Sequence, residues 1–338
     1  MAEFRPDRRA LGALIAGAAA TAWTRGAQGA GLPSIPPPSA PPTPPDSDRT
    51  LAAKADLSLR MTAPVTVNGQ GPYQFVVDTG ANRSVISREL AAALKLPSAA
   101  SAPLHSVAGM EMVETVKVEH LAVSGLEVPG AQIPVLPANR LGADGLLGVD
   151  GLGGRRLIMN FHQKTLTITA NEPKPRREAL LIEIPAKRRF GQLMIIDASI
   201  EQTPIVAFLD SGAQSTVGNL ALYDRVRDSA EVLAPRQETL ILSATDQTAV
   251  GLIGTVPGLR LGRLTIETTR GAFANLHAFE IWDLIKRPAI LLGMDVLRHF
   301  EWVEMDYARS VVGFRLDPSN MPIDRSRGDV GARVIPFD

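Results

Sequence analysis

Two aspartates end apolar runs of the chain, and each is followed by a hydroxyl residue, a glycine and an alanine. Asp78 lies in FVVDTGANRSVIS (75–87) and Asp210 in AFLDSGAQSTVGN (207–219). An isolated ionised carboxylate at the end of a buried strand is costly. Either motif alone suits a simple turn after a strand. Two copies in one chain indicate a pair of carboxylates kept for acid–base chemistry.

A second pair of matched motifs follows the first pair in the same order. GLLGVDGL (145–152) matches ILLGMDVL (290–297). Two ordered matches indicate an internal repeat rather than coincidence. If the two halves pack about a pseudo-twofold axis near both strand ends, that axis brings Asp78 and Asp210 together.

Composition and motifs divide the chain into six expected segments. The stretch NEPKPRRE (171–178) has the polar, proline-containing composition of a linker. The last residues, ARVIPFD (332–338), are a candidate terminal strand. The segments that we expect are an export signal (1–30), a proline-rich spacer (31–56), a first lobe (57–171), a linker (172–179), a second lobe (180–317) and a tail (318–338).

The N-terminal segment predicts export. Arg8 and Arg9 precede an apolar stretch, 11–23, that is too short for a confident membrane span but fits a signal peptide. The arginine pair resembles a twin-arginine signal; the alternative is an N-terminal tail with two chance arginines. We therefore expect a periplasmic or secreted protein, with transient membrane proximity through this segment. The prolines that follow make an extended spacer.

The composition excludes several classes of function. The chain has 35 Lys plus Arg, 35 Asp plus Glu and no cysteine. A formal net charge of zero argues against a nucleic-acid partner, and the lack of cysteine excludes disulfides, thiolate zinc sites and a cysteine nucleophile. The histidines lack metal-ligand spacing, so we expect no metal and no cofactor. His105 is expected to be a surface histidine.

The hydrophobic pattern predicts a mainly β chain. Alternation around 116–123 is typical of a strand, and Asn68-Gly69 predicts a tight hairpin turn. Helical patterns are few and short, at 87–96, 220–226 and 295–300.

Both halves resemble the retropepsin-like unit of aspartic proteases. The resemblance covers about residues 57–317 and implies an all-β fold with two similar β-barrel lobes, a pseudo-twofold axis and a few short helices, as in bacterial single-chain forms. A lone Asp-Thr-Gly is a weak signal, whereas the ordered set is strong. The motifs are Asp78-Thr79-Gly80-Ala81, Asp210-Ser211-Gly212-Ala213, Leu146-Leu147-Gly148 and Leu291-Leu292-Gly293.

The resemblance implies that Asp78 and Asp210 form a catalytic dyad holding one water molecule. Two carboxyl groups at that distance cannot both ionise easily, so the pair shares one proton. Aspartic proteases are the standard example of this effect. The ionised acid acts as general base, and the protonated acid donates to the substrate carbonyl. The apparent pKa values belong to the pair, so neither role is assigned to one residue.

The resemblance also assigns supporting roles around the acids. The hydroxyls of Thr79 and Ser211 would brace the two loops, and the glycines would permit close approach. Ala81 and Ala213 cannot donate a hydrogen bond from their side chains, which predicts a pH optimum less acidic than that of pepsin, mildly acidic to near neutral. The remaining supports would be Gly80, Gly212, Leu147, Gly148, Leu292 and Gly293. Asp150 and Asp295 are expected to cap short helices.

Two hairpins are expected to cover the site and bind substrate. The first spans 105–113 and the second 240–251. The second tip lacks glycine, so either the first hairpin is the more mobile or the second is a fixed wall. The tip residues that we expect to contact substrate are Val107, Ala108, Gly109, Ala244 and Thr245.

These features together predict an exported aspartic endopeptidase, a monomer with an internal pseudo-dimer, acting on a polypeptide substrate by limited processing. The alternative from another class is a non-catalytic peptide-binding protein on the same scaffold. A two-carboxylate glycosidase has no support beyond the two acids. Pairing of each half with its twin in a second chain also stays open.

Overall fold

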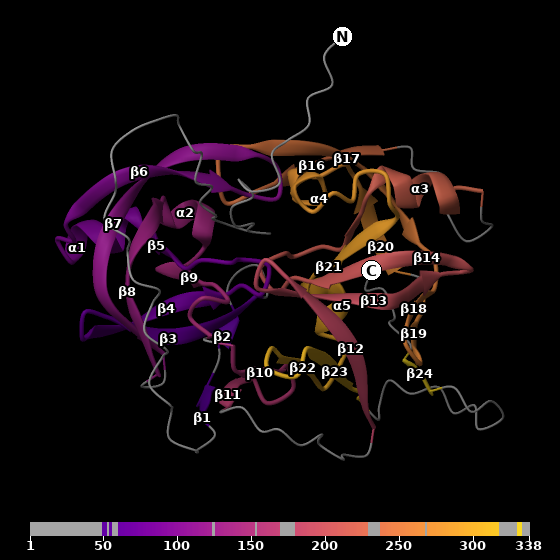
Figure 1. The fold of residues 1–338 in the computed structure, drawn as a ribbon, viewed down its shortest axis with the longest axis horizontal. Coiled ribbons are helices and arrows are strands. Elements are labelled where there is room, and N and C mark those ends of the chain that lie inside the picture. Colours follow the sequence, from indigo (N-terminus) through magenta and orange to yellow (C-terminus); the bar gives the residue numbers. More distant parts are fainter. Residues whose placement is uncertain are drawn as a thin grey trace, which may run out of the picture.

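The computed structural model describes residues 49–52, 54–55, 60–123, 126–152, 154–169, 180–228, 237–267, 269–317 and 330–332. This part of the chain is built mainly from β-strands, with five short helices (Figure 1). The all-β prediction is therefore confirmed. None of the helices in these ranges has the length and hydropathy needed to cross a membrane.

The first half is largely one sheet with two short helices. Its elements are β1 (Arg49–Ala52), β2 (Lys54–Ala55), β3 (Met61–Val67), β4 (Gln70–Val77), β5 (Val85–Ser87), α1 (Arg88–Ala93), β6 (Ser98–His105), β7 (Met110–Val123), β8 (Leu126–Leu136), α2 (Ala138–Leu141), β9 (Gly145–Leu147), β10 (Arg156–Asn160) and β11 (Thr165–Thr169).

The second half is larger and contains three short helices in its described ranges. Its elements are β12 (Leu181–Arg189), β13 (Gln192–Ile200), β14 (Thr203–Leu209), β15 (Val217–Gly218), α3 (Leu220–Val226), β16 (Gln237–Leu242), β17 (Thr248–Val256), β18 (Leu259–Leu261), β19 (Leu264–Ile266), β20 (Thr269–Phe273), α4 (His277–Ile281), β21 (Ala289–Leu292), α5 (Met294–Leu297), β22 (Trp302–Asp306), β23 (Val311–Arg315) and β24 (Val330–Ala332).

The same succession of strand pairings occurs in both halves. In the first half it runs β3-β4-β9-β5-β8-β7-β6, and in the second β13-β14-β21-β15-β20-β17-β16. The parallel pair β4–β9 aligns Val77 with Leu147, and the parallel pair β14–β21 aligns Leu209 with Leu292. Each aspartate motif therefore leaves its strand beside the end of an apolar-apolar-glycine strand. The relation of the lobes by a pseudo-twofold axis stays a prediction.

Local sequence signals explain the hairpin turn between β3 and β4 and the starts of two helices. Asn68 and Gly69 both have positive φ, 49° and 76°, as the predicted hairpin turn between β3 and β4 requires. Ser87 caps α1 by accepting a hydrogen bond from the Leu90 N–H at 3.1 Å. Asn219 caps α3 in the same way. Two of the three predicted helices, α1 and α3, thus begin at a polar cap at the end of an aspartate motif.

One continuous sheet joins the two halves below the aspartate motifs. Its order begins β1-β11-β10-β22-β23-β12 and continues through β12 into β13. Strand β10 of the first half pairs antiparallel with β22 of the second, from Arg156 opposite Asp306 to Asn160 opposite Trp302. In Figure 1 these strands lie at the bottom of the view, between the two halves. Backbone hydrogen bonds therefore restrict how the halves can move relative to each other.

Two of the expected segments can be compared with strands of the structure. Strands β1 and β2 lie within 31–56, so ordered pairing begins before the expected start of the first lobe at 57. In the tail, Val330–Ala332 forms β24 beside β19, and only Ala332 belongs to the predicted terminal strand. The expected export signal and linker lie outside the described residues.

A buried ion pair crosses the joint between β10 and β22. The Arg156 Nη1 and Glu304 Oε1 atoms lie 3.8 Å apart, and both side chains are almost fully buried. The substitution Glu304→Ala leaves a buried guanidinium without this partner. We expect it to lower the free energy of unfolding by about 3–5 kcal/mol in a urea titration.

The matched control for this prediction is Glu301→Ala. Glu301 pairs with Arg315 at 3.3 Å on the same sheet, but both side chains are partly exposed. Surface pairs contribute about 0–1 kcal/mol, so this change should be small. Equal losses for the two variants would contradict the assigned importance of the buried pair.

Candidate active site

Asp78 and Asp210 occupy equivalent positions at the ends of β4 and β14. Each backbone N–H donates to the carbonyl of the neighbouring strand end, from Asp78 to Leu147 and from Asp210 to Leu292, both at 3.0 Å. Each Oδ1 accepts the N–H of the following glycine at 2.9 Å. The strand end and the turn therefore hold both carboxyl groups in one orientation, and almost no surface of either residue is exposed.

Four hydrogen bonds brace the two aspartate loops against each other. The Thr79 hydroxyl donates to the Leu209 carbonyl at 3.0 Å, and the Ser211 hydroxyl donates to the Val77 carbonyl at 2.7 Å. In return, the Ser211 N–H donates to Thr79 Oγ1 at 3.0 Å, and the Thr79 N–H donates to Ser211 Oγ at 3.1 Å. The structure thus places these two residues in the bracing arrangement that the family resemblance implies.

The space between the carboxyl groups leaves no room for a side chain at Gly212. A Cβ atom there would lie 2.3 Å from Cγ of Asp78, a distance that real Cβ atoms do not adopt. The Oδ2 atoms of both aspartates are buried and have no conventional hydrogen-bond partner among the described residues. The two carboxyl groups therefore face each other as their nearest polar partners at the junction of the halves.

Burial dominates the protonation of this pair. Burial raises the pKa of Asp78 to about 6, while the charge of Arg60 and the N–H of Gly80 act in the opposite direction. Burial and then the charge of Asp78 raise the pKa of Asp210 well above its usual range. A buried pair of like charges cannot be doubly ionised without cost. At near-neutral pH the pair is expected to hold one proton, mainly on Asp210.

Arg60 is a charged neighbour that the sequence patterns do not identify. It is 9% exposed, and its Nη2 donates to the Leu141 carbonyl at 2.6 Å. Its charge favours the ionised form of Asp78, and no equivalent cation is among the causes of the Asp210 shift. A single arginine before an apolar strand gives no sequence signal, because its approach to the acid depends on the packing of β9 and α2.

The apolar-apolar-glycine motifs pass close behind the aspartate loops. A Cβ on Gly148 would lie 2.6 Å from the Arg83 carbonyl carbon, and one on Gly293 would lie 2.7 Å from that of Ser215. Only glycine permits this approach without displacing the backbone. Leu147 and Leu292, which precede these glycines, are fully buried.

The expected capping role of Asp150 and Asp295 is wrong. Asp150 accepts the N–H and hydroxyl of Ser84, at 2.9 and 2.8 Å. Asp295 accepts the same two groups of Thr216, both at 2.8 Å. The N-cap of α5 is Gly293, which has no side chain to cap with. These two acids hold the chain that leaves each aspartate motif.

The tips of two hairpins each pack against the opposite half of the chain. Val107, on the tip between β6 and β7, packs in an apolar cluster with Phe208 and Trp282. Ala244, on the tip between β16 and β17, packs in a cluster with Ala81 and residues of the first sheet. Figure 1 shows the two hairpins converging at the top of the view. The tips therefore cross above the aspartate loops.

Polar contacts join the crossed tips directly. The Ser106 and Thr245 hydroxyls lie 2.9 Å apart. The Ala278 N–H, on α4, donates to the Val107 carbonyl at 3.3 Å. A Cβ on Gly109 would lie 2.9 Å from Cγ of Gln247. Ala108 is partly buried against the same cluster as Val107. All five predicted tip residues therefore lie at this crossing.

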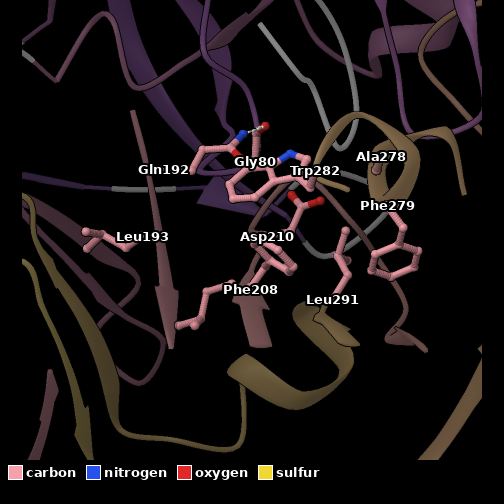
Figure 2. A pocket seen from close by; sticks show the side chains of 10 residues that line it. Gly80, Gln192, Leu193, Phe208, Asp210, Ala278, Phe279, Trp282 and Leu291 are labelled. Carbon is pink, nitrogen blue, oxygen red and sulfur yellow. Dashed lines mark hydrogen bonds between the residues drawn. The ribbon is translucent and has the colours of Figure 1, made fainter. Parts of the chain in front are cut away.

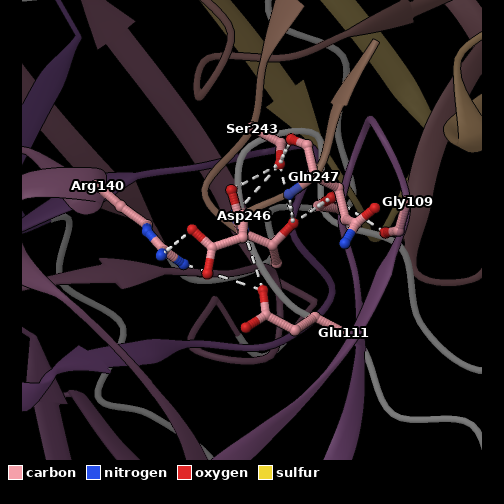
Figure 3. Close-up of polar contacts among 8 residues, drawn as sticks. Gly109, Glu111, Arg140, Ser243, Asp246 and Gln247 are labelled. Carbon is pink, nitrogen blue, oxygen red and sulfur yellow. Dashed lines mark hydrogen bonds and ion pairs between the residues drawn. The ribbon is translucent and has the colours of Figure 1, made fainter.

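The second tip is also held by charges of the first half (Figure 3). Arg140, on α2, forms a short ion pair with Asp246 and lies 3.9 Å from Glu111 Oε2. The Asp246 N–H donates to the same Glu111 oxygen at 3.0 Å. Arg140 of α2 and Glu111 of β7 thus hold the tip that lacks glycine.

His105 differs from its expected surface position. It is partly buried, and its Nδ1 lies 2.9 Å from Nε2 of His277, with the rings stacked 5.2 Å apart. The Nδ1 of His277 lies 3.0 Å from Glu280 on the same helix. Burial, and next the charge of His277, lower the pKa of His105 to about 4. The first tip is therefore joined to α4 through an uncharged histidine at neutral pH.

The described ranges contain no group of three or more histidine, aspartate or glutamate side chains arranged to hold a metal ion. The two buried carboxyl groups offer proton transfer. Such a pair can deprotonate a water molecule and protonate a carbonyl oxygen in one step.

Comparison with known protein families agrees with this geometry. Residues 63–150 match the family model described as aspartyl protease. The matched range contains Asp78, the first hairpin and Leu147-Gly148, and it bears out the resemblance to retropepsin-like aspartic proteases for the first half. The same resemblance of the second half stays a prediction. The match indicates a hydrolase of the peptidase type. No curated protein matches the chain.

The raised pKa values predict how stability depends on pH. Because folding raises the pKa of Asp210, the folded state binds more protons than the unfolded state, and stability falls as pH increases above about 4. The variant Asp210→Asn should therefore melt at a higher temperature than the wild type at pH 8, and the difference should shrink towards pH 4. Differential scanning calorimetry across this range measures it.

The exposed Asp228 supplies a control, because Asp228→Asn should change the melting temperature little at either pH. A melting temperature of Asp210→Asn at or below that of the wild type at pH 8 would show that ionised Asp210 is not the costly group described here.

Proposed function

We propose that this protein is an aspartic endopeptidase in which Asp78 and Asp210 activate one water molecule. The observation that carries the proposal is the braced pair of buried carboxyl groups, whose Oδ2 atoms have no conventional hydrogen-bond partner among the described residues. The family match of residues 63–150 supports the same reading for the half that contains Asp78.

The proton positions suggest a division of roles in the free enzyme. The charge of Arg60 favours ionised Asp78, while the pKa of Asp210 is raised further by its neighbour. Asp78 then takes a proton from water as the oxygen attacks the peptide carbon, and Asp210 donates its proton to the carbonyl oxygen. Collapse of the resulting diol returns a proton to Asp210, Asp78 gives its proton to the leaving nitrogen, and the C–N bond breaks.

A mildly acidic to near-neutral optimum follows from the same groups. Neither Ala81 nor Ala213 offers a side-chain hydroxyl to its carboxylate. The pKa of about 6 for Asp78 lies well above the ordinary aspartate range. The ionised base therefore accumulates only as pH approaches 6, and the acid limb of kcat/KM should lie there rather than at strongly acidic pH.

The substrate class that suits the site is an extended polypeptide. Two hairpins cross above the carboxyl groups, and such lids exclude water and position a peptide through main-chain hydrogen bonds. The N-terminal pattern of an arginine pair and an apolar stretch supports a role outside the cytoplasm. We therefore propose limited processing of exported proteins by a monomeric enzyme that needs no cofactor.

The test of the dyad is cleavage of an unfolded protein by Asp78→Asn and Asp210→Asn. Each variant removes one of the two carboxyl groups that exchange protons with water and substrate. We therefore expect each to lower kcat/KM by about 100- to 10,000-fold. Quantification of new peptide termini by mass spectrometry, from pH 3 to pH 8, measures both the loss and the pH optimum. A pepstatin-type inhibitor should abolish wild-type cleavage.

The variant Asp224→Asn, at an exposed position, is the control and should keep full activity. Retained activity in either dyad variant would refute a single shared site. No wild-type cleavage at any pH, together with tight binding of the same peptides, would favour the non-catalytic peptide-binding protein.

The crossed tips should have to separate before a polypeptide enters. The chain has no cysteine, so Ser106→Cys/Thr245→Cys introduces a single cysteine pair at hydroxyls that lie 2.9 Å apart. Oxidation should lock the tips, and we expect cleavage of a long substrate to fall at least about tenfold and return on reduction. Each single cysteine variant is the control. Full activity of the oxidised double variant would show that substrate enters without separation of the tips.

A further inference from the structure

A small apolar pocket opens beside Asp210 (Figure 2). Among the described residues that line it, only Asp210 is charged, and aromatic and leucine side chains form most of the wall. The cavity volume is about 20 Å³. A space of this size holds one water molecule or a comparably small group. The principal wall residues are Leu193, Phe208, Phe279, Trp282 and Leu291.

The wall of the pocket is held in place and cannot easily retreat. The rings of Phe208 and Trp282 pack edge to face with centroids 4.3 Å apart, and Phe190 packs edge to face against Trp282 from another direction at 5.6 Å. The Arg189 Nη1 donates to the Trp282 carbonyl at 2.8 Å. Enlargement of the pocket for a bulky side chain would have to disrupt these contacts.

The indole nitrogen of the wall residue Trp282 has no hydrogen-bond partner among the described residues. Trp282 is 1% exposed, and its indole Nε1–H has no hydrogen-bond acceptor among the described residues. Figure 2 shows this nitrogen on the edge of the ring that is turned towards Gly80 and Gln192. The Gln192 amide donates to the Gly80 carbonyl. A buried donor without an acceptor is unfavourable, so a ligand that supplies an oxygen there would gain binding energy.

We infer that this pocket selects serine or threonine in the substrate, next to the cleaved bond, through a hydrogen bond from the Trp282 indole N–H to the substrate hydroxyl. The inference rests on the proposed function, because it assigns the pocket to the peptide that the dyad cleaves. The cavity admits a small side chain and disfavours leucine or phenylalanine. An alanine fits but leaves the donor unpaired, and a carboxylate would face the charge of the dyad.

The test measures selectivity both by cleavage and by binding. Peptides with serine, threonine, alanine, leucine or phenylalanine at each position flanking the cleaved bond are compared by kcat/KM. The same peptides with a reduced amide in place of that bond are compared by calorimetric titration, which needs no catalysis. We expect wild type to prefer serine over alanine by about tenfold at one position, and to bind phenylalanine less well than either.

Two variants separate hydrogen bonding from size. Trp282→Phe removes the N–H and should abolish the preference for serine over alanine. Phe279→Leu should enlarge the pocket and improve leucine relative to alanine while the serine preference is kept. The control is Trp302→Phe, a buried tryptophan in a separate apolar cluster, which should leave the selectivity unchanged. Calorimetric melting identifies variants that fail to fold.

The outcomes distinguish this inference from the proposed function. Wild-type cleavage without a serine or threonine preference would overturn the inference alone. If Trp282→Phe lowered kcat/KM and affinity equally for all peptides, the inference would also be overturned. Such a result would mean that the wild-type indole binds a main-chain carbonyl of the substrate and not a side-chain hydroxyl. A serine preference in binding without any cleavage would support the pocket and overturn the endopeptidase.

Discussion

The structure depends on holding two carboxyl groups side by side in a buried site, where water does not screen the repulsion between their charges. Coulomb repulsion between Asp78 and Asp210 and their loss of hydration both oppose this arrangement. The opposing force comes from the four hydrogen bonds of Thr79 and Ser211, in which each hydroxyl both donates and accepts across the junction. Because all four partners are buried, loss of one hydroxyl would leave unsatisfied groups as well as a weaker brace.

The sheets supply the rigidity that this brace requires. Parallel pairs β4–β9 and β14–β21 end together, so each aspartate is bonded to a strand that is itself central in its sheet. The joint between β10 and β22 then ties the two halves of the chain together below the site. A pair of acids on flexible loops would relax apart and regain water. Held on strand ends, they keep raised pKa values, and those values provide the acid and base.

The sequence predicted the parts of this arrangement that recur as motifs. These parts are the two aspartates, the hydroxyl residues and the glycines. They could be placed because the same residue types occur in the same order in both halves. Arg60, Gln192 and Trp282 could not, because each reaches the site through packing between distant segments. Asp150 and Asp295 show a further limit: position beside a short helix suggested a cap, whereas their partners lie 66 and 79 residues away. His105 was wrongly predicted to be a surface residue, because its partner, His277, belongs to the other half.

The two halves are most alike at the acids and most different above them. At the base of the site, corresponding hydrogen bonds of the two loops agree closely in length. Above it, one tip meets α4 through two stacked histidines, and the other meets α2 through an arginine and two acids. Proton sharing requires near equivalence of the carboxyl groups, but a peptide has direction and gains from unequal walls. Under the proposed function, the asymmetry of Trp282 and of the two tips above the acids suits a substrate that has direction.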